Sequence, residues 1–222
     1  MIDRIAFDYA PIIFMDKKEP FAIKKVGFTE YHVNECRSDS FNRTFDFANF
    51  EGAVRVLEYA YYLDYDIQHL YDLEHIWVYL DKEGRVVGAE GSYHGRFLNA
   101  MNRAIGEDAV QKGKRIKMYS QPGKHAMLSD PALMYLHSEL YPSCDRLAGI
   151  YGLDAPERFI TDLKLTTTEN QKVVDHIRDH FRFVPSMEFE EVSISEADYM
   201  SWEELAERIP EFIRDELSKI LP

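Results

Sequence analysis

Cysteine is scarce in this chain of 222 residues, which has only Cys36 and Cys144. Two cysteines do not make a disulfide framework or a thiolate zinc site. We therefore expect both thiols to be free and to behave as small, buried hydrophobic groups. The sequence also lacks any run approaching the roughly 18 apolar residues that a membrane helix needs. We accordingly expect no integral membrane contact.

A secretory signal is missing from the first residues as well. The opening stretch, MIDRIAFDYAPIIF, has an acidic residue at Asp3 and no basic region in front of an apolar segment. A signal peptide begins with such a basic region. We therefore expect a cytoplasmic protein.

Basic residues are few, because 26 Lys and Arg stand against 39 Asp and Glu and give a formal net charge of −13. Phosphate backbones and anionic lipids repel such a chain unless its basic residues are segregated. The densest basic stretch, residues 111–117, has no interleaved aromatic residues and is typical of a solvated loop. No glycine-rich phosphate loop or nucleophile elbow occurs either. We therefore expect no nucleic-acid partner.

The first half of the chain has the pattern of β-strands. Residues 53–63, 73–80, 85–94 and 115–122 are rich in β-branched and aromatic side chains, and short turns follow several of them. Short turns connect antiparallel strands, whereas parallel strands need long crossovers. The sequence thus predicts a mainly β protein, an antiparallel β-sandwich. Residues 96–113 and 131–153 are expected to hold short inserted helices, and 41–50 either a half-buried strand or a loop fixed by its rings.

The C-terminal third changes to helical periodicity. Thr168 and Gln171 predict a capping box for one helix, and Ser201 and Glu204 predict another for the last helix. We therefore divide the chain into a β-sandwich domain at residues 1–165, which holds the candidate metal ligands described next, and a helical extension at 166–222 packed on it.

Potential metal ligands crowd the beginning of the strand at residues 73–80. Strand residues two apart share a face, so Asp72 and Glu74 lie at the open end of the face that carries Ile76 and Val78. Burying an unpaired carboxylate costs several kcal/mol. The pair therefore demands water, a cation or shifted pKa values.

Asp66 and His69 precede that strand and are expected in the loop leading into it, where loops can turn side chains inward. Carboxylates and imidazole without a thiolate suit Mg²⁺, Mn²⁺, Ca²⁺ or a non-thiolate Zn²⁺ site. His75 lies on the opposite face of the strand, and we expect it in the core or supporting a ligand from behind.

The returning strand brings a further histidine near. A hairpin loop at residues 81–85 would set Glu74 opposite Ser92 and Asp72 opposite His94. A one-residue bulge in this hairpin would instead send His94 to the other face of the sheet.

The same stretch resembles the core of the necrosis- and ethylene-inducing-like proteins (NLPs), whose hallmark heptapeptide is G-H-R-H-D-W-E. The matching residues are QHLYDLE, which place His69, Asp72 and Glu74 on the family's metal-site positions. YAYYLDYD resembles the family's tyrosine-rich strand, which ends in a metal-site aspartate, here Asp66. EGSYHG is similar to a Ser-x-His-Gly hairpin at His94. MYSQPGKHAML is similar to a strand followed by a metal-site histidine, here His125.

Other family positions have changed. Gln68, Leu70, Tyr71 and Leu73 stand where the family has glycine, arginine, histidine and tryptophan. The stretch YAPIIFMDKKEPF also resembles the opening of the related fungal vacuolar-sorting-type β-sandwich proteins. The resemblance covers residues 9–130 in scattered blocks and leaves the C-terminal third unmatched.

The resemblance implies a β-sandwich with a divalent metal at a surface cavity, where a polar, sugar-like or anionic small ligand binds. It places Asp66, His69, Asp72, Glu74 and His125 on the metal, directly or through water, with His94 and Tyr71 near it. NLPs act outside cells on sphingolipid sugar headgroups, and without a signal peptide we do not expect that toxin activity here.

Three functions remain open at this point. The first is a non-catalytic, metal-dependent binding protein. The second is a metal-dependent hydrolase that uses a metal-bound water with Glu74 or His94 as the base. The third is an interaction protein in which the acidic cluster is a solvated strand end and the C-terminal helices mediate assembly.

Overall fold

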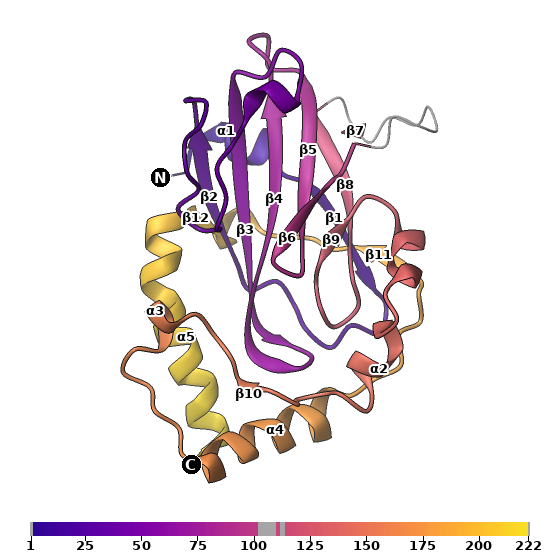
Figure 1. Cartoon of the computed structure of the whole chain (residues 1–222), viewed down its shortest axis with the longest axis vertical. Helices are drawn as coiled ribbons and strands as arrows, with labels where there is room; N and C mark the ends of the chain where they lie inside the picture. Colours follow the sequence, from indigo (N-terminus) through magenta and orange to yellow (C-terminus); the bar gives the residue numbers. More distant parts are fainter. Residues whose placement is uncertain (1, 102–109, 112–113, 222) are drawn as a thin grey trace.

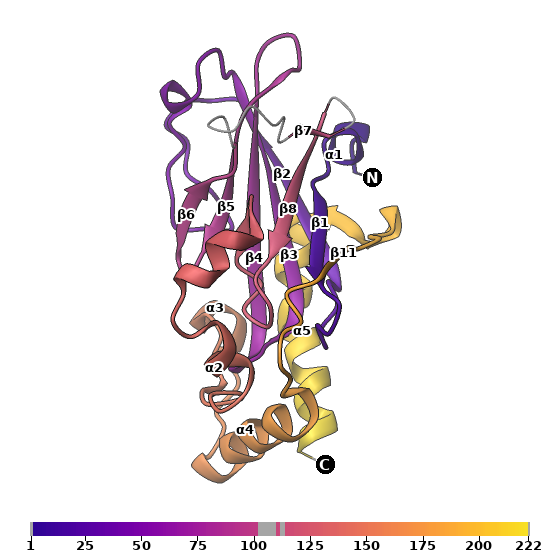
Figure 2. The same cartoon turned by 90° about the vertical axis from the view of Figure 1, so that its right-hand side faces the viewer.

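The computed structural model describes residues 2–101, 110–111 and 114–221. Two β-sheets lie face to face, and helices cover one end and one side of them (Figures 1 and 2). The mainly β fold predicted from the sequence is confirmed, and so is the presence of a helical C-terminal segment.

The larger sheet has seven strands within the described residues. Its order is β12 (Tyr199–Ser201), β2 (Lys25–Tyr31), β3 (Arg55–Asp66), β4 (His69–Leu80), β5 (Val86–Tyr93) and β6 (Arg96–Asn99), and β10 (Gly152–Leu153) pairs with the start of β4. The predicted strands at 53–63 and 73–80 are therefore the central hairpin. β4 begins four residues earlier than the pattern predicted.

The smaller sheet has five strands in the same described part of the chain. Its order is β11 (Phe189–Glu191), β1 (Ile12–Asp16), β8 (Arg115–Ser120) and β7 (Val110–Gln111), and β9 (Met127–Leu128) pairs with β8. Three strand pairs run parallel, namely β1 with β8, β2 with β12 and β4 with β10. The sheets are thus mixed rather than purely antiparallel, because long connections return these strands in the same direction.

The main core lies between the sheets. Ile13 and Met118 of the smaller sheet belong to one buried apolar cluster with Leu57, Ile76 and Val78 of the larger sheet. A second cluster covers the outer face of the larger sheet, where the loop before β3 places Phe45, Phe47 and Phe50 over Trp77 and Tyr79. Residues 41–50 therefore form a loop fixed by its rings, the second of the two alternatives.

Short helices fill the remaining connections. They are α1 (Arg4–Asp8), α2 (Leu140–Cys144), α3 (Glu157–Ile160) and the 3₁₀ turns η1 (Phe47–Asn49), η2 (Pro131–Leu136) and η3 (Glu196–Asp198). The region 131–153 holds the short helices expected there. Residues 96–99 form a strand where a helix was expected, and 102–109 and 112–113 lie outside the described residues.

The C-terminal residues contribute both helices and strands. Helix α4 (Thr167–Phe181) crosses the end of the sheets near the β3–β4 turn, and α5 (Trp202–Ile220) runs along β2 (Figure 1). Strand β11 belongs to the smaller sheet and strand β12 to the larger one. The division of the chain at residue 165 stays a prediction. No helix in the described ranges is long and apolar enough to cross a lipid bilayer.

One helix cap follows the sequence prediction and the other does not. The Ser201 side chain accepts the Glu204 N–H at the start of α5, which is one of the two hydrogen bonds of the predicted capping box. The capping box of α4 is formed by Thr166 and Glu169. The predicted box of Thr168 and Gln171 is therefore wrong by two residues. Helix α4 begins at Thr167, so its N-cap is Thr166.

Candidate functional site

The candidate site begins at the tip of the β3–β4 hairpin. Asp66 is the last residue of β3 and pairs with His69, the first residue of β4, across a two-residue turn. These two residues thus lie in strands and not in the predicted loop. The Asp66 Oδ1 atom accepts the Gln68 N–H at 2.7 Å, which fixes the turn. The Ile67 N–H donates to the Gly123 carbonyl at 2.7 Å and fastens a distant turn to this tip.

That distant turn, residues 121–126, carries two of the charged groups. The His125 N–H donates to the Gln121 carbonyl, and the Gln121 N–H donates to the Ala126 carbonyl, each at 2.8 Å. Gly123 has φ +68°, and a Cβ atom there would lie 2.9 Å from Ile67 Cβ and from Cys144 Sγ. Only glycine permits this close approach, so the turn can lie directly on the hairpin tip.

His125 lies between two carboxylates. Its Nδ1 is 2.7 Å from Asp72 Oδ2 and its Nε2 is 3.4 Å from Glu19 Oε1, with the side chain fully buried. Burial disfavours the protonated ring, but Glu19 and Asp72 outweigh this effect and raise the pKa of His125 to about 10. The backbone is left-handed at φ 54°, a conformation that surrounding contacts must hold in place. At neutral pH the site therefore contains an imidazolium ion.

Glu19 was missed by sequence reasoning. It comes from the connection after β1, far along the chain from the hairpin. Its Oε2 accepts the Gly123 N–H at 2.7 Å, so it binds the turn as well as His125. Nothing in the spacing of DKKEP distinguishes this carboxylate from a solvated turn residue.

Lys124 was also missed, although it precedes a predicted ligand. Its Nζ lies 2.6 Å from Asp66 Oδ2 and donates to Gln68 Oε1 at 3.1 Å. Burial lowers the pKa of Lys124, but the charges of Asp66, Asp72 and Glu74 outweigh it and leave the pKa raised. The ammonium group is therefore a permanent charge among these carboxylates.

Glu74 lies at the partly exposed end of the cluster and accepts a hydrogen bond from Ser92 Oγ. Burial, and then the Asp72 charge, raises the pKa of Glu74 to about 8. The predicted pairing with β5 is off by one residue, because a bulge between Tyr79 and Leu80 sets Ile76 opposite Gly91. The predicted opposition of Asp72 and His94 is accordingly wrong. The bulge occurs, but His94 follows the end of β5 and stays near the cluster, where burial, and then the charges of Lys124 and Asp66, affect its pKa.

The structure places the other predicted residues around this centre. His69 Nε2 is 3.8 Å from Asp66 Oδ2, while its buried Nδ1 has no hydrogen-bond partner. His94 is an exposed residue whose ring is partly buried beside the cluster, where its Nε2 is 3.0 Å from Gln121 Oε1. The Tyr71 ring packs against Tyr62 and Phe159, and burial, followed by the charges of Asp72 and Glu74, raises the pKa of Tyr71.

His75 occupies the opposite face of β4, as expected for a core residue. Its ring stacks on Trp77 at 5.5 Å and is almost fully buried, and neither ring nitrogen has a hydrogen-bond partner. Burial, followed by the charges of Arg158 and Arg43, lowers the pKa of His75 to about 3. The ring is therefore neutral at physiological pH.

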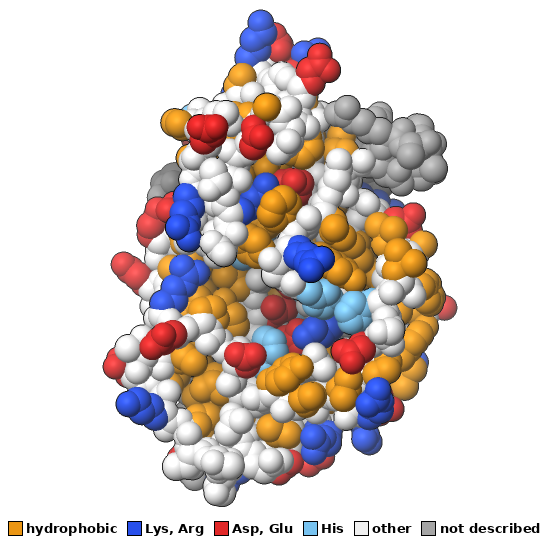
Figure 3. All heavy atoms as spheres, viewed as in Figure 1, with side chains coloured by type: hydrophobic (Ala, Val, Ile, Leu, Met, Phe, Trp, Pro, Cys, Tyr) orange, Lys and Arg blue, Asp and Glu red, His pale blue; other side chains and the backbone are white. Residues whose placement is uncertain are grey.

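Acidic, basic and histidine side chains gather in one hollow of the molecular surface, bordered by hydrophobic side chains (Figure 3). The cluster contains four carboxylates and two cationic side chains: Glu19, Asp66, Asp72, Glu74, Lys124 and His125. In the part of the chain that the structure describes, no three His, Cys, Asp or Glu side chains are grouped to hold a metal ion. The carboxylates are instead engaged by Lys124 and His125.

The chemistry of the donor set nevertheless suits a hard divalent cation. Asp66, Asp72 and Glu74 offer oxygen donors, and His69 offers a buried nitrogen without a partner. The acidic groups outnumber the cationic ones, so added positive charge would stabilise the ionised cluster. His125 fits direct ligation less well, because both its nitrogens already face carboxylates. It is placed to orient Asp72.

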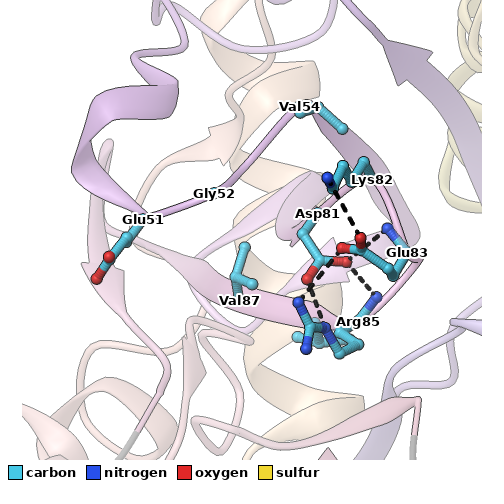
Figure 4. A pocket seen from close by; sticks show the side chains of 9 residues that line it. Glu51, Gly52, Val54, Asp81, Lys82, Glu83, Arg85 and Val87 are labelled. Atoms are coloured by element: carbon cyan, nitrogen blue, oxygen red, sulfur yellow. Dashed lines mark hydrogen bonds and ion pairs between the residues drawn. The ribbon is translucent and has the colours of Figure 1, made fainter.

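Another hollow of about 660 Å³ lies at the opposite end of β4 (Figure 4). Asp81 there accepts the N–H groups of Glu83 and Arg85 and pairs with the Arg85 side chain at 2.6 Å. Lys82 lies 3.6 Å from Glu83. These charges serve the β4–β5 turn itself, so the histidine-containing cluster is the better candidate site.

No family model and no curated protein matches this chain. Among solved structures it is similar to NLPPya, an NLP, in a complex with glucosamine, with 14% identity, a TM-score of 0.36 and 57% of this chain covered. A mutant of NLPPya gives 15% identity, a TM-score of 0.34 and 55% coverage. The chain spans 66% and 63% of those two chains, just under two thirds of their length. The resemblance predicted from the sequence is thus a distant one.

Proposed function

We propose that this chain is a non-catalytic binding protein that holds a divalent cation at the β3–β4 hairpin tip and binds a polar, sugar-like or anionic small ligand beside it. The observation that carries this proposal is that Asp66, Asp72 and Glu74 interact electrostatically with one another at the start of β4, with His69 beside Asp66. Lys124 and His125 supply two positive charges to four carboxyl groups, so the cluster remains able to accept further positive charge.

Each residue has a distinct part in the proposed site. Asp66, Asp72 and Glu74 supply oxygen ligands, and His69 supplies a nitrogen. His125 orients Asp72 through the 2.7 Å contact with its Nδ1. When bound, a divalent cation would offer open coordination positions to hydroxyl or anionic oxygens of a ligand.

The cation can be tested directly. We expect elemental analysis of the purified protein, or titration of metal-stripped protein with Mn²⁺, Mg²⁺, Ca²⁺ and Zn²⁺, to give about one divalent ion per chain. Binding to the folded state alone should raise the melting temperature, and chelator should lower it. An unmoved melting point with all four ions, and no bound metal, would overturn the proposal and favour a solvated or structural cluster.

Matched variants make this test specific. Asp66→Asn should lose the metal-induced rise in melting temperature. Asp64→Asn is the control, because Asp64 lies on the same strand but pairs with Lys24 at 2.8 Å, outside the cluster. If both variants respond to metal like the unaltered protein, Asp66 is not a ligand.

The small ligand needs a separate measurement. Glucosamine, the sugar present in one NLPPya structure, is a suitable first probe. Calorimetric titration with glucosamine and with inorganic phosphate, each with Mn²⁺ and with chelator, should show binding only when the cation is present. If a probe binds equally well in chelator, the small ligand binds independently of the cation.

A metal-dependent hydrolase is the second candidate. It needs a base beside the cation that is not itself a ligand, and His94 meets this condition beside Gln121. Partial burial of the ring, and then the Lys124 charge, lowers the pKa of His94 and keeps it neutral. Turnover of phosphoesters, esters or glycosides that disappears in both His69→Ala and His94→Ala would favour the hydrolase. If none of these substrates is turned over, the non-catalytic binding function remains the better proposal.

A further inference from the structure

An ammonium group occupies the space among the candidate ligands. Lys124 Nζ is 2.6 Å from Asp66 Oδ2 and donates to Gln68 Oε1 at 3.1 Å, and only 12% of the side chain is exposed. Its charge also acts on Asp72 and Glu74. One positive charge of this chain therefore already interacts with all three proposed oxygen ligands.

The backbone of Lys124 is held by the turn, and its ammonium group stands at the end of a chain of single bonds. The 121–126 turn is closed by the hydrogen bonds of Gln121 and fastened to the hairpin at Gly123. From this anchored backbone, a flexible four-carbon stem carries the ammonium group to Asp66. Rotation of this stem away from Asp66 would leave the backbone hydrogen bonds of the turn unchanged.

We propose that Lys124 is a built-in competitor for the divalent cation, which must displace its ammonium group from Asp66 in order to bind. This inference rests on the proposed function. Coordination of Asp66 Oδ2 by a metal would bring two positive charges within a few ångströms of each other. At such a separation the repulsion in a partly buried site is strong. The lysine and the metal therefore exclude each other, and Lys124 raises the concentration of cation that the site needs.

A neighbouring ion pair provides the contrast. Lys24 and Asp64 also pair at 2.8 Å near the same hairpin, with 31% and 22% of their side chains exposed. That pair has one lysine and one carboxylate close together and is accessible to water. Lys124 instead shares a crowded acidic cluster, so Lys24→Met is a matched control for the loss of a paired lysine.

The test compares the affinity of metal-stripped proteins for Mn²⁺ by calorimetric titration. Lys124→Met should bind Mn²⁺ at least about tenfold more tightly than the unaltered chain. Lys124→Arg keeps the charge and Lys24→Met leaves the cluster untouched, so neither should tighten binding. Equal or weaker Mn²⁺ binding by a folded Lys124→Met variant would overturn the inference.

A measurement on the unaltered protein covers the case in which Lys124→Met does not fold. Acetylation of lysine amines, followed by peptide mass spectrometry, reports how accessible each ammonium group is. Mn²⁺ should increase the labelling rate of Lys124 several-fold and leave that of Lys24 unchanged. If Mn²⁺ binds and the labelling of Lys124 does not rise, the lysine is not displaced and the inference is wrong.

The same measurements separate this inference from the proposed function. If the unaltered chain binds Mn²⁺ and Lys124→Met binds it no better, the metal site stands and the competition is refuted. If only Lys124→Met binds Mn²⁺, the competition stands and the native chain is not a metal-dependent protein. If neither binds any of the four ions, both proposals fail.

Discussion

His125 and Asp72 form a buried, charge-assisted hydrogen bond in which Nδ1 lies 2.7 Å from Oδ2. They come from the 121–126 turn and from β4, so this contact joins two segments that are far apart in the sequence. The contact makes the charge of the candidate site part of what holds the fold together. It also makes the stability of the protein sensitive to pH.

We expect the metal-free protein to lose stability as the pH rises above neutrality. The pKa of His125 is raised to about 10, so its contribution is complete below about 6.5 and is lost as the pH rises through 10. The pKa of Glu74 is raised to about 8, so ionisation of Glu74 also lowers the free energy of unfolding as the pH rises from about 4.5 to 8. The loss should be on the order of a few kcal/mol, measured by urea unfolding in chelator at several pH values.

His125→Gln provides the comparison that isolates this effect, because other groups also titrate in alkali. The variant should be less stable at pH 7, and the difference from the unaltered chain should shrink as the pH approaches 10. A difference that stays constant from pH 6 to pH 10 would show that His125 is not charged in the folded protein.

We expect His75→Phe to stabilise the protein by about 1 kcal/mol at pH 7. Both ring nitrogens of His75 are buried without partners beside Trp77 and Phe41, and leaving such groups unsatisfied costs stability. Because the pKa of His75 is lowered to about 3, the native protein should also lose stability as the pH falls from about 6.5. Urea midpoints at pH 7 and pH 5 test both statements, and the variant should lose less on acidification. Destabilisation at pH 7 would show that the histidine has a partner there.

Gly123→Ala should destabilise the protein by about 1 to 3 kcal/mol. The new Cβ would lie 2.9 Å from Ile67 and Cys144, in a backbone conformation with φ +68°. Gly95→Ala is the control, since Gly95 has φ +75° but no atom within 4 Å of a Cβ. Its cost should be limited to about 1 kcal/mol of backbone strain. Equal costs in thermal unfolding would mean that the contact with the hairpin tip is unimportant.

The two candidate caps of α4 can be distinguished by substitution. Thr166→Ala removes the side chain that accepts the Glu169 N–H and should cost about 1 kcal/mol. Thr168→Ala lies within the first turn on an exposed position and should be neutral or slightly stabilising. Chemical unfolding of both variants measures the difference. If Thr168→Ala costs more stability than Thr166→Ala, Thr168 is the N-cap.

Local pattern was sufficient to predict the two central strands and the opposite faces of β4. The alternation of residues 72–80 separates Ile76 and Val78 from His75 and Trp77, because side chains alternate along any strand. The Ser201 cap could be predicted for the same reason, since it depends on four consecutive residues.

Register and strand direction could not be predicted in this way. The bulge between Tyr79 and Leu80 adds one residue to the β4–β5 pairing and depends on how the sheet packs, as the turn sequence does not specify it. The parallel pairs of β1 with β8 and of β2 with β12 join distant segments. Their direction follows from long connections whose course no local pattern encodes.

The sequence by itself determined the kinds of side chains that the site would contain. Asp66, His69, Asp72 and Glu74 are close along the chain, so a hairpin brings them to one end of a sheet whatever surrounds it. Only the tertiary structure decided how their charges are balanced. Glu19 and Lys124 reach the cluster because the 121–126 turn is bonded to the hairpin tip and to the connection after β1. Electrostatic interactions depend on distance in space, so a lysine far along the chain can take the position that the local pattern assigns to a metal ion.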